Sequence, residues 1–164
     1  MNSKNFLLII IGICIALFLK LFIIDMVKVS GPSMSPTLED KTTVYISKLA
    51  YGIPIPFGNQ LAVQWAKPEN GDVVIFLHNN KMVVKRCCGV AGQVLEYSTN
   101  TGYSLHIDGK TYPLTEAQYQ RIKYDSVVPE NTILAIGDNA SESVDSRDYG
   151  FIPVHCVLGK VLCK

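Results

Sequence analysis

The sequence has no excess of charge of either sign and no spacing typical of a metal site. Its 15 lysine and arginine residues nearly balance 14 acidic residues over 164 positions, for a formal charge of +1. This balance gives no indication of nucleic-acid binding or of an acidic partner. No C-x-x-C or H-x-x-x-H spacing occurs, so a metal cofactor is not expected. Low-complexity tracts and internal repeats are also missing.

The five cysteines do not form a recognisable framework. Cys14 lies in an apolar N-terminal run, apart from Cys87, Cys88, Cys156 and Cys163. Oxidising conditions outside the cytoplasm would allow the last four to pair. Neighbouring cysteines rarely pair with each other, because the geometry is strained. We interpret these residues as small buried hydrophobes and leave their pairing open.

The apolar run Phe6–Ile24 reads FLLIIIGICIALFLKLFII. As a helix it would be about 28 Å long, close to the ~30 Å of a bilayer's hydrocarbon core. Lys20 lies near its far end, where a long side chain can reach the interface. The sequence therefore predicts a transmembrane anchor in residues 1–25 and a second domain in residues 26–164.

A cleavable signal peptide is the alternative for this segment, since Phe6–Leu19 is short enough for its apolar region. No A-x-A-like site follows, which favours an uncleaved anchor. Lys4 favours a cytoplasmic N-terminus, although Lys20 and Lys28 weaken that bias. We expect a single-pass protein of the plasma (inner) membrane with residues 26–164 outside the cytoplasm.

The remainder of the chain has a mostly β pattern. Short β-branched and apolar runs alternate with turn signals, which indicates a compact antiparallel sheet or barrel, mainly β in class. One short helix is expected at Thr115–Lys123, with Thr115 as its N-cap, and Tyr51–Asn59 is expected to be a loop. The expected strands are Thr42–Ser47, Val73–Leu77, Met82–Cys88, Val94–Tyr97, Ser104–Ile107, Thr132–Ile136 and Cys156–Leu162.

Ser33 is a candidate nucleophile, because it lies in the stiff loop Ser30-Gly31-Pro32-Ser33-Met34-Ser35-Pro36 just after the apolar run. The chain from Ile24 to Ser33 spans at most roughly 30 Å. Ser33 is therefore held near whatever surface the apolar run enters. The G-x-S-x-G context is missing and the three histidines occupy turn or strand positions, so a histidine-based triad is not favoured.

Lys85 is a candidate base for Ser33. Strand alternation places Val83, Lys85 and Cys87 on one face, so the lysine has apolar neighbours. A lone lysine in a strand is most often simply solvated, and that interpretation stays open. With a pKa near 10.4, only about one lysine in 2,500 is neutral at pH 7, and burial can supply the roughly 4–5 kcal/mol needed to change this. Ser–Lys pairs are a known alternative to Ser–His–Asp triads.

Taken in order, several blocks resemble the bacterial type I signal peptidases, which are membrane-bound Ser–Lys proteases. The resemblance covers essentially the whole chain, in a short form that lacks a large inserted second domain. It rests on SGPSMSPTL at 30–38, LAYGIPIPF at 49–57, NGDVVIF at 70–76, VVKRCCGVAG at 83–92, GDNASESVDSRDYGFIP at 137–153 and LGK at 158–160.

The resemblance implies a role for each matching residue. Ser33 corresponds to the nucleophile and Lys85 to the general base. The family's supporting residues correspond to Ser143, which orients the lysine, to the ion pair of Asp145 and Arg147, and to the turn of Gly137 and Asp138.

The resemblance also implies an oxyanion hole at the Ser33 backbone N–H. Some members have a second donor, a serine hydroxyl, at the position of Gly31, and this donor is open here because glycine has no side chain. The substrate would lie as an added strand beside Gly31, Met34, Val83 and Val84. No metal or organic cofactor is implied.

The expected function is therefore a serine endopeptidase that removes N-terminal signal peptides from secreted preproteins. It would cut at the membrane surface after small residues, at A-x-A-like sites, with preproteins and the lipid bilayer as partners. A maturation peptidase of the same superfamily, for example for conjugative pilin, is one alternative. A tethered β-module with a degenerate site is the non-enzymatic alternative.

Overall fold

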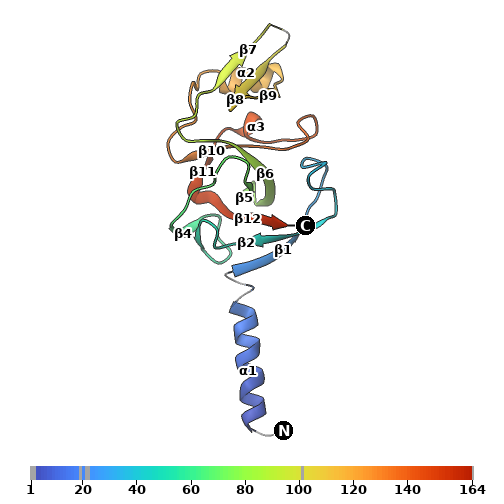
Figure 1. Ribbon diagram of the computed structural model, residues 1–164, viewed down its shortest axis with the longest axis vertical. Helices are drawn as coiled ribbons and strands as arrows, with labels where there is room; N and C mark the ends of the chain where they lie inside the picture. Colours follow the sequence, from blue (N-terminus) through green and yellow to red (C-terminus); the bar gives the residue numbers. More distant parts are fainter. Residues whose placement is uncertain (1–2, 19, 21–22, 101, 164) are drawn as a thin grey trace.

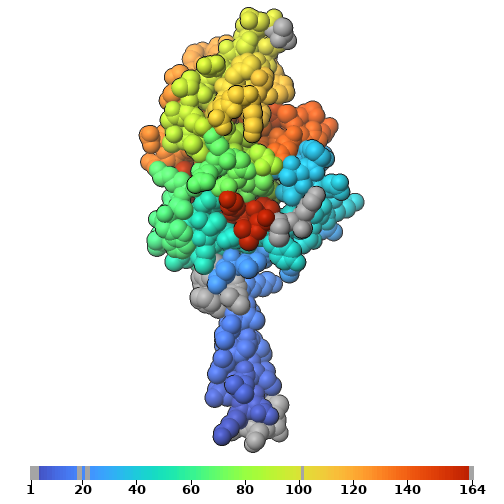
Figure 2. Space-filling view, viewed as in Figure 1, coloured from blue at the N-terminus to red at the C-terminus, as the bar shows by residue number. Residues whose placement is uncertain are grey.

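The computed structural model describes residues 3–18, 20, 23–100 and 102–163. Helix α1 (Ser3–Phe18) projects from a β-rich body as a stalk, as Figures 1 and 2 show. A three-stranded sheet, formed by β7 (Glu96–Ser98), β8 (Ser104–Ile107) and β9 (Lys110–Pro113), lies at the opposite end together with helix α2 (Glu116–Ile122). The stalk and this small sheet thus mark the two ends of the molecule.

The body is built on a seven-stranded antiparallel sheet in the order β1-β2-β12-β5-β6-β10-β11. Residues from both faces of this sheet are buried, which explains the continuous apolar runs of its central strands. Its strands are β1 (Ile24–Lys28), β2 (Thr43–Ser47), β5 (Val73–His78), β6 (Lys81–Val90), β10 (Thr132–Ile136), β11 (Ile152–Pro153) and β12 (Val157–Cys163). The predicted mainly β class and antiparallel pairing are confirmed.

The predicted helix Phe6–Ile24 is wrong at its C-terminal end. Helix α1 ends at Phe18, and Ile24 begins the edge strand β1, where it pairs with Ser47 of β2. Asp25 of β1 forms an ion pair with Lys48 at 2.8 Å. Pairing with β2 thus places Ile24, the last residue of the apolar run, in a strand rather than in the expected helix.

The predicted anchor, residues 1–25, includes residues 1–2, 19 and 21–22, which lie outside the described part of the chain. Among the described residues, no helix combines the length and apolar character needed to cross a bilayer.

The structure also contains short elements that were not expected from the sequence. The predicted loop Tyr51–Asn59 contains β3 (Gly52–Pro54), which forms a hairpin with β4 (Leu61–Gln64). Helix α3 (Ser146–Tyr149) lies in the polar segment after β10 and is capped by the Asp145 side chain. The predicted short helix is confirmed as α2, with Thr115 as its N-cap.

Candidate active site

Ser33 and Lys85 are 52 positions apart in the chain, yet their side chains meet. Lys85 Nζ donates a hydrogen bond to Ser33 Oγ at 2.7 Å. Lys85 lies on β6 with 4% of its surface exposed, and Ser33 lies in the loop between β1 and β2 and is half-buried. The structure therefore brings the candidate nucleophile and the candidate base into direct contact.

Three contacts hold the Ser33 loop in place. The side chain of Met34 is 1% exposed and packs with Val29 and other residues of one core cluster. The Ser33 carbonyl accepts a hydrogen bond from the Asn139 backbone at 3.0 Å. Asp40 accepts another from the Gly31 N–H at 2.8 Å. The loop is thus fixed both before and after the serine, so Ser33 Oγ needs little reorganisation to stay near Lys85.

Burial shapes the acid–base properties of Lys85. Removal from water is the largest influence and lowers the pKa of Lys85 below its ordinary value of 10.5. The negative charges of Asp145 and Asp148 act in the opposite direction, while the positive charge of Arg147 adds to the lowering. The effect of desolvation is larger than that of the two carboxylates, so the amine loses its proton more easily than a solvated lysine would.

Behind the two residues lies a fully buried ion pair between Asp145 and Arg147. The Arg147 guanidinium donates to Asp145 through Nε at 2.9 Å and through Nη2 at 2.9 Å. Arg147 also donates to the backbone carbonyls of Pro113 at 3.0 Å and Ala140 at 2.9 Å. Two buried charges that satisfy each other in this way fix the segment that faces the Ser33 loop.

Asp145 also organises the neighbouring polar groups. It accepts hydrogen bonds from the Ser143 hydroxyl at 2.6 Å and from the Gly137 N–H at 3.0 Å. Burial alone would raise the pKa of Asp145, but hydrogen bonds from Arg147, Gly137 and Ser143 lower it below the ordinary value of 3.8. The hydrogen bond found for the Ser143 hydroxyl goes to Asp145, so its orienting role toward Lys85 stays a prediction.

Gly137 lies against the Ser33 loop with no room for a side chain. A Cβ built at this position would lie 2.5 Å from the Ser33 carbonyl oxygen and 2.7 Å from the Ser143 Cβ, and would also collide with the Ser143 hydroxyl. The expected turn of Gly137 and Asp138 therefore packs directly on Ser33, and its glycine is required by close approach.

We expect Gly137→Ala to reduce both stability and activity, because its methyl group would displace the Ser33 loop. Overpacking of this kind typically destabilises a protein by about 1–3 kcal/mol. Thermal unfolding together with a cleavage assay would measure the two effects. Gly12→Ala is a suitable control, since a Cβ at Gly12 has no neighbour within 4 Å. A fully active Gly137→Ala protein would contradict the packing argument.

The sequence reasoning missed Arg86, which holds Asp138. Arg86 donates to Asp138 through Nε at 2.7 Å and through Nη2 at 2.6 Å, and through Nη1 to the Gly71 carbonyl at 2.8 Å. Hydrogen bonding to Asp138 raises the pKa of Arg86. The adjacent Lys-Arg pair in VVKRCCGVAG was the available signal, since alternation places the arginine on the face opposite the lysine.

A cavity of about 320 Å³ opens beside Ser33 and Lys85. Gly31, Met34, Val83 and Val84, which were predicted to contact substrate, all line it. Gly31 has a φ of +96°, a backbone conformation that side chains disfavour. A side chain at position 31 would be strained in this backbone conformation.

No described cysteine side chain lines the cavity beside Ser33 and Lys85. Cys14, Cys87, Cys88 and Cys156 are free thiols, and the Cys163 side chain lies outside the described residues. Burial raises the pKa of Cys87 to about 12. Within the described residues, no group of three or more histidine, cysteine, aspartate or glutamate side chains is arranged to hold a metal ion. The buried cysteines behave as small hydrophobes, as expected.

Comparison with known proteins identifies the family of the chain. The model of a protein family described as signal peptidase, peptidase S26, matches residues 3–164. The chain belongs to this family. Signal peptidase I of Bacillus caldolyticus is 28% identical in an alignment of 169 positions that covers 92% of this chain and 84% of that relative. Signal peptidase IB of Staphylococcus aureus strain Mu50 is 30% identical in an alignment of 161 positions that covers 85% of this chain and 76% of that relative.

A crystal structure of a signal peptidase I from Enterococcus faecalis V583 aligns with 59% of this chain and 97% of the solved chain, at 28% identity and a TM-score of 0.42. Membership of the signal peptidase family makes the chain a serine peptidase that removes signal peptides from preproteins. The resemblance drawn from the sequence blocks is confirmed, and the hypothesis of a non-enzymatic β-module is disfavoured.

Proposed function

We propose that Ser33 is the nucleophile and Lys85 the general base of signal-peptide cleavage. The observation that carries this proposal is the 2.7 Å contact between Lys85 Nζ and Ser33 Oγ, at a lysine that is 4% exposed. A charged Lys85 donates to the serine in this contact. Once Lys85 is neutral, the same distance lets the hydroxyl donate to the amine, which is the arrangement that proton abstraction needs.

The reaction then proceeds in two steps at one serine. Ser33 Oγ attacks the scissile carbonyl while Lys85 takes its proton, and the proton passes to the leaving amine as the acyl-enzyme forms. Lys85 next removes a proton from a water molecule as the water oxygen attacks the ester carbonyl. It then gives this proton to Ser33 Oγ as the ester bond breaks, which restores both groups. Because lysine serves as base in both steps, the role needs an amine that loses its proton readily, as the lowered pKa of Lys85 allows.

The developing oxyanion is proposed to bind the Ser33 backbone N–H. Within the described residues this N–H has no hydrogen-bond acceptor. One preorganised donor of this kind stabilises the transition state by about 2.7–4 kcal/mol. Gly31 has no side chain to contribute, so a second donor would have to come from elsewhere.

The substrate is proposed to add as a strand to an open edge of β6. Strand β10 pairs with β6 only from Arg86 to Val90, whereas β5 pairs with it from Lys81 to Arg86. Along Met82–Lys85, the edge of β6 opposite β5 has no strand partner among the described residues. This edge borders the cavity that contains Ser33, so an extended peptide there would meet the nucleophile.

Two further parts of the proposal concern specificity and location. We expect cleavage after small residues, at A-x-A-like sites, with the apolar N-terminal segment that contains α1 as a membrane anchor and residues 26–164 outside the cytoplasm. The continuously exposed apolar side chains of α1 support an anchor, since they lack a protein partner in the described chain. The short link from α1 to the Ser33 loop supports cleavage close to the bilayer.

The proposal is tested by incubating purified full-length protein with a model preprotein and locating the cut by mass spectrometry. We expect a single cut after a small residue at the end of the signal peptide. Ser33→Ala should leave the preprotein intact, and Ser35→Ala, two positions away in the same loop, should cleave it. Cleavage by the Ser33→Ala protein would refute the assignment of the nucleophile.

The reaction should depend on pH through Lys85. Because the free-enzyme pKa of Lys85 lies below 10.5, kcat/KM should rise with pH and level off before an unperturbed lysine would be neutral. The measurement is kcat/KM for a peptide substrate from pH 6 to 10 in a buffer series of constant ionic strength. A rate that falls as pH rises through this range would be incompatible with a lysine base.

A further inference from the structure

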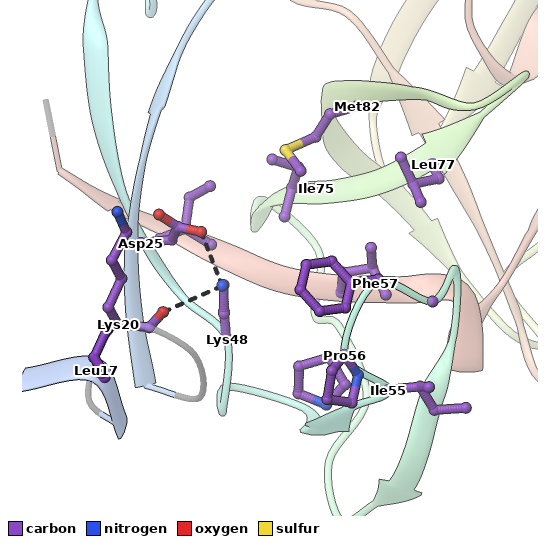
Figure 3. A pocket seen from close by; sticks show the side chains of 14 residues that line it. Leu17, Lys20, Asp25, Lys48, Ile55, Pro56, Phe57, Ile75, Leu77 and Met82 are labelled. Atoms are coloured by element: carbon purple, nitrogen blue, oxygen red, sulfur yellow. Dashed lines mark hydrogen bonds and ion pairs between the residues drawn. The ribbon is translucent and has the colours of Figure 1, made fainter. Parts of the chain in front are cut away.

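A second and larger hollow lies where α1 meets the body, with a volume of about 540 Å³ (Figure 3). Most of its wall is apolar and comes from the end of α1, the tip of the β3–β4 hairpin and strands β5, β6 and β12. Lys48 closes one side, where it forms an ion pair with Asp25 at 2.8 Å and donates to the Lys20 carbonyl at 3.3 Å. In Figure 3, Phe57, Pro56 and Ile55 form the rim opposite this pair.

This groove adjoins the cavity beside Ser33 at one shared residue. Met82 lines both hollows and is 51% exposed between them. It precedes Lys85 by three positions on β6, a distance of about 10 Å along a strand. A peptide added to the open edge of β6 therefore has room for about three residues between Ser33 and the start of the groove.

The direction of the substrate follows from how signal peptides are built. Their apolar region precedes the cleavage site, so the residues upstream of the scissile bond must lead back toward the bilayer. In this chain the apolar helix α1 marks that side, and Leu17 of α1 lines the groove. A bound substrate would therefore have the same chain direction as β6. Its residues upstream of the cut would lie beside Met82 and reach this groove.

The tip of the hairpin has features that folding alone does not explain. Phe57 is fully exposed and has a φ of +59°, a backbone conformation that costs about 1–2 kcal/mol for a residue with a side chain. Asparagine or glycine would satisfy the turn with less strain. A large apolar ring held at the rim of an apolar groove is better explained by contact with a ligand than by stability.

Resting on the proposed function, we propose that this groove binds the apolar residues of the signal peptide from about the fourth position upstream of the cut. The enzyme would thereby recognise two features of its substrate at separate places. Small residues would fit beside Ser33, and the end of the apolar region would fit between Phe57 and the sheet. The groove is a binding surface and takes no part in the chemical step.

The test compares two substrates with the full-length protein in phospholipid nanodiscs. One substrate is a preprotein with its complete signal peptide, and the other is a short peptide that begins three residues before the cut. The variant Ile55→Glu/Phe57→Glu places charge at the rim. Val63→Glu is the matched control, because Val63 is an exposed residue of the same hairpin that does not line the groove.

We expect the double variant to raise KM for the preprotein about tenfold, equivalent to about 1.4 kcal/mol of binding, and to cleave the short peptide as the wild type does. Val63→Glu should match the wild type on both substrates. Wild-type cleavage of the preprotein by the double variant would overturn the inference. An equal loss with Val63→Glu would also overturn it, since that pattern indicates docking of the whole hairpin on lipid. A wild-type protein that cleaves neither substrate overturns the proposed function and this inference with it.

Discussion

Replacement of Lys85 by methionine is expected to lower kcat/KM for preprotein cleavage by roughly 10²–10⁴-fold, the usual contribution of a general base. Methionine has a similar length and fits an apolar strand face, but it has no lone pair strong enough to accept the Ser33 proton. Lys85→Arg should fail as well, because a guanidinium does not deprotonate at a usable pH. Steady-state kinetics on the purified variants would measure both losses.

Lys85→Met is also expected to raise the melting temperature. A variant that is inactive but more stable would show that its loss of activity does not come from unfolding. The pKa of Lys85 is lower in the folded protein than its ordinary value of 10.5, so the unfolded chain binds a proton more readily. At pH values below its folded pKa, Lys85 therefore lowers the free energy of unfolding by its full amount. This destabilisation disappears as the pH approaches 10.5. A Lys85→Met protein that unfolds at a lower temperature than the wild type at pH 7 would contradict the burial argument.

Replacement of Asp145 by alanine is expected to destabilise the protein by about 3–5 kcal/mol, the typical effect of removing one partner from a buried ion pair. It would leave the Arg147 charge, the Ser143 hydroxyl and the Gly137 N–H without their acceptor. Activity should fall too, since Gly137 packs on Ser33. Chemical denaturation would give the stability change, and Glu130→Ala, at an exposed carboxylate, should stay within about 0.5 kcal/mol of the wild type.

The pH dependence of stability gives a second signature of Asp145. Its folded pKa is lowered below 3.8, so its contribution is present in full at higher pH and is lost as pH falls through the folded value. The difference in unfolding free energy between wild type and Asp145→Ala should therefore be constant from pH 6 to 8 and shrink toward acid pH. A difference that grows with acidification would contradict an ionised Asp145.

The sequence was sufficient for the parts of the site that depend on local pattern. Strand alternation placed Lys85 among apolar neighbours, and the Gly/Pro-rich loop marked Ser33 as a rigidly held serine. The ordered blocks then identified the family, which the comparison confirmed. Residue chemistry offered Lys85 as a candidate base for Ser33, and the resemblance supported the pairing. Their direct contact depends on the fold, because the residues lie 52 positions apart and on different elements.

Features that depend on contacts between distant segments could not be predicted from local sequence patterns. Ile24 ends an apolar run that reads as helix, yet it pairs with Ser47 in a strand. Arg86 and Asp138 are 52 positions apart, and only the fold brings them together as an ion pair. The apolar groove near Phe57 is formed by segments that are distant in the chain, so no local sequence pattern predicts it.

The central claim is that Lys85 activates Ser33, and intact-protein mass spectrometry after incubation with a serine-acylating inhibitor tests it most directly. We predict one covalent adduct on the wild type, located on the peptide containing Ser33, none on Ser33→Ala and at least a hundredfold slower labelling of folded Lys85→Met. Labelling of Lys85→Met at the wild-type rate, or an adduct on another serine, would contradict the account.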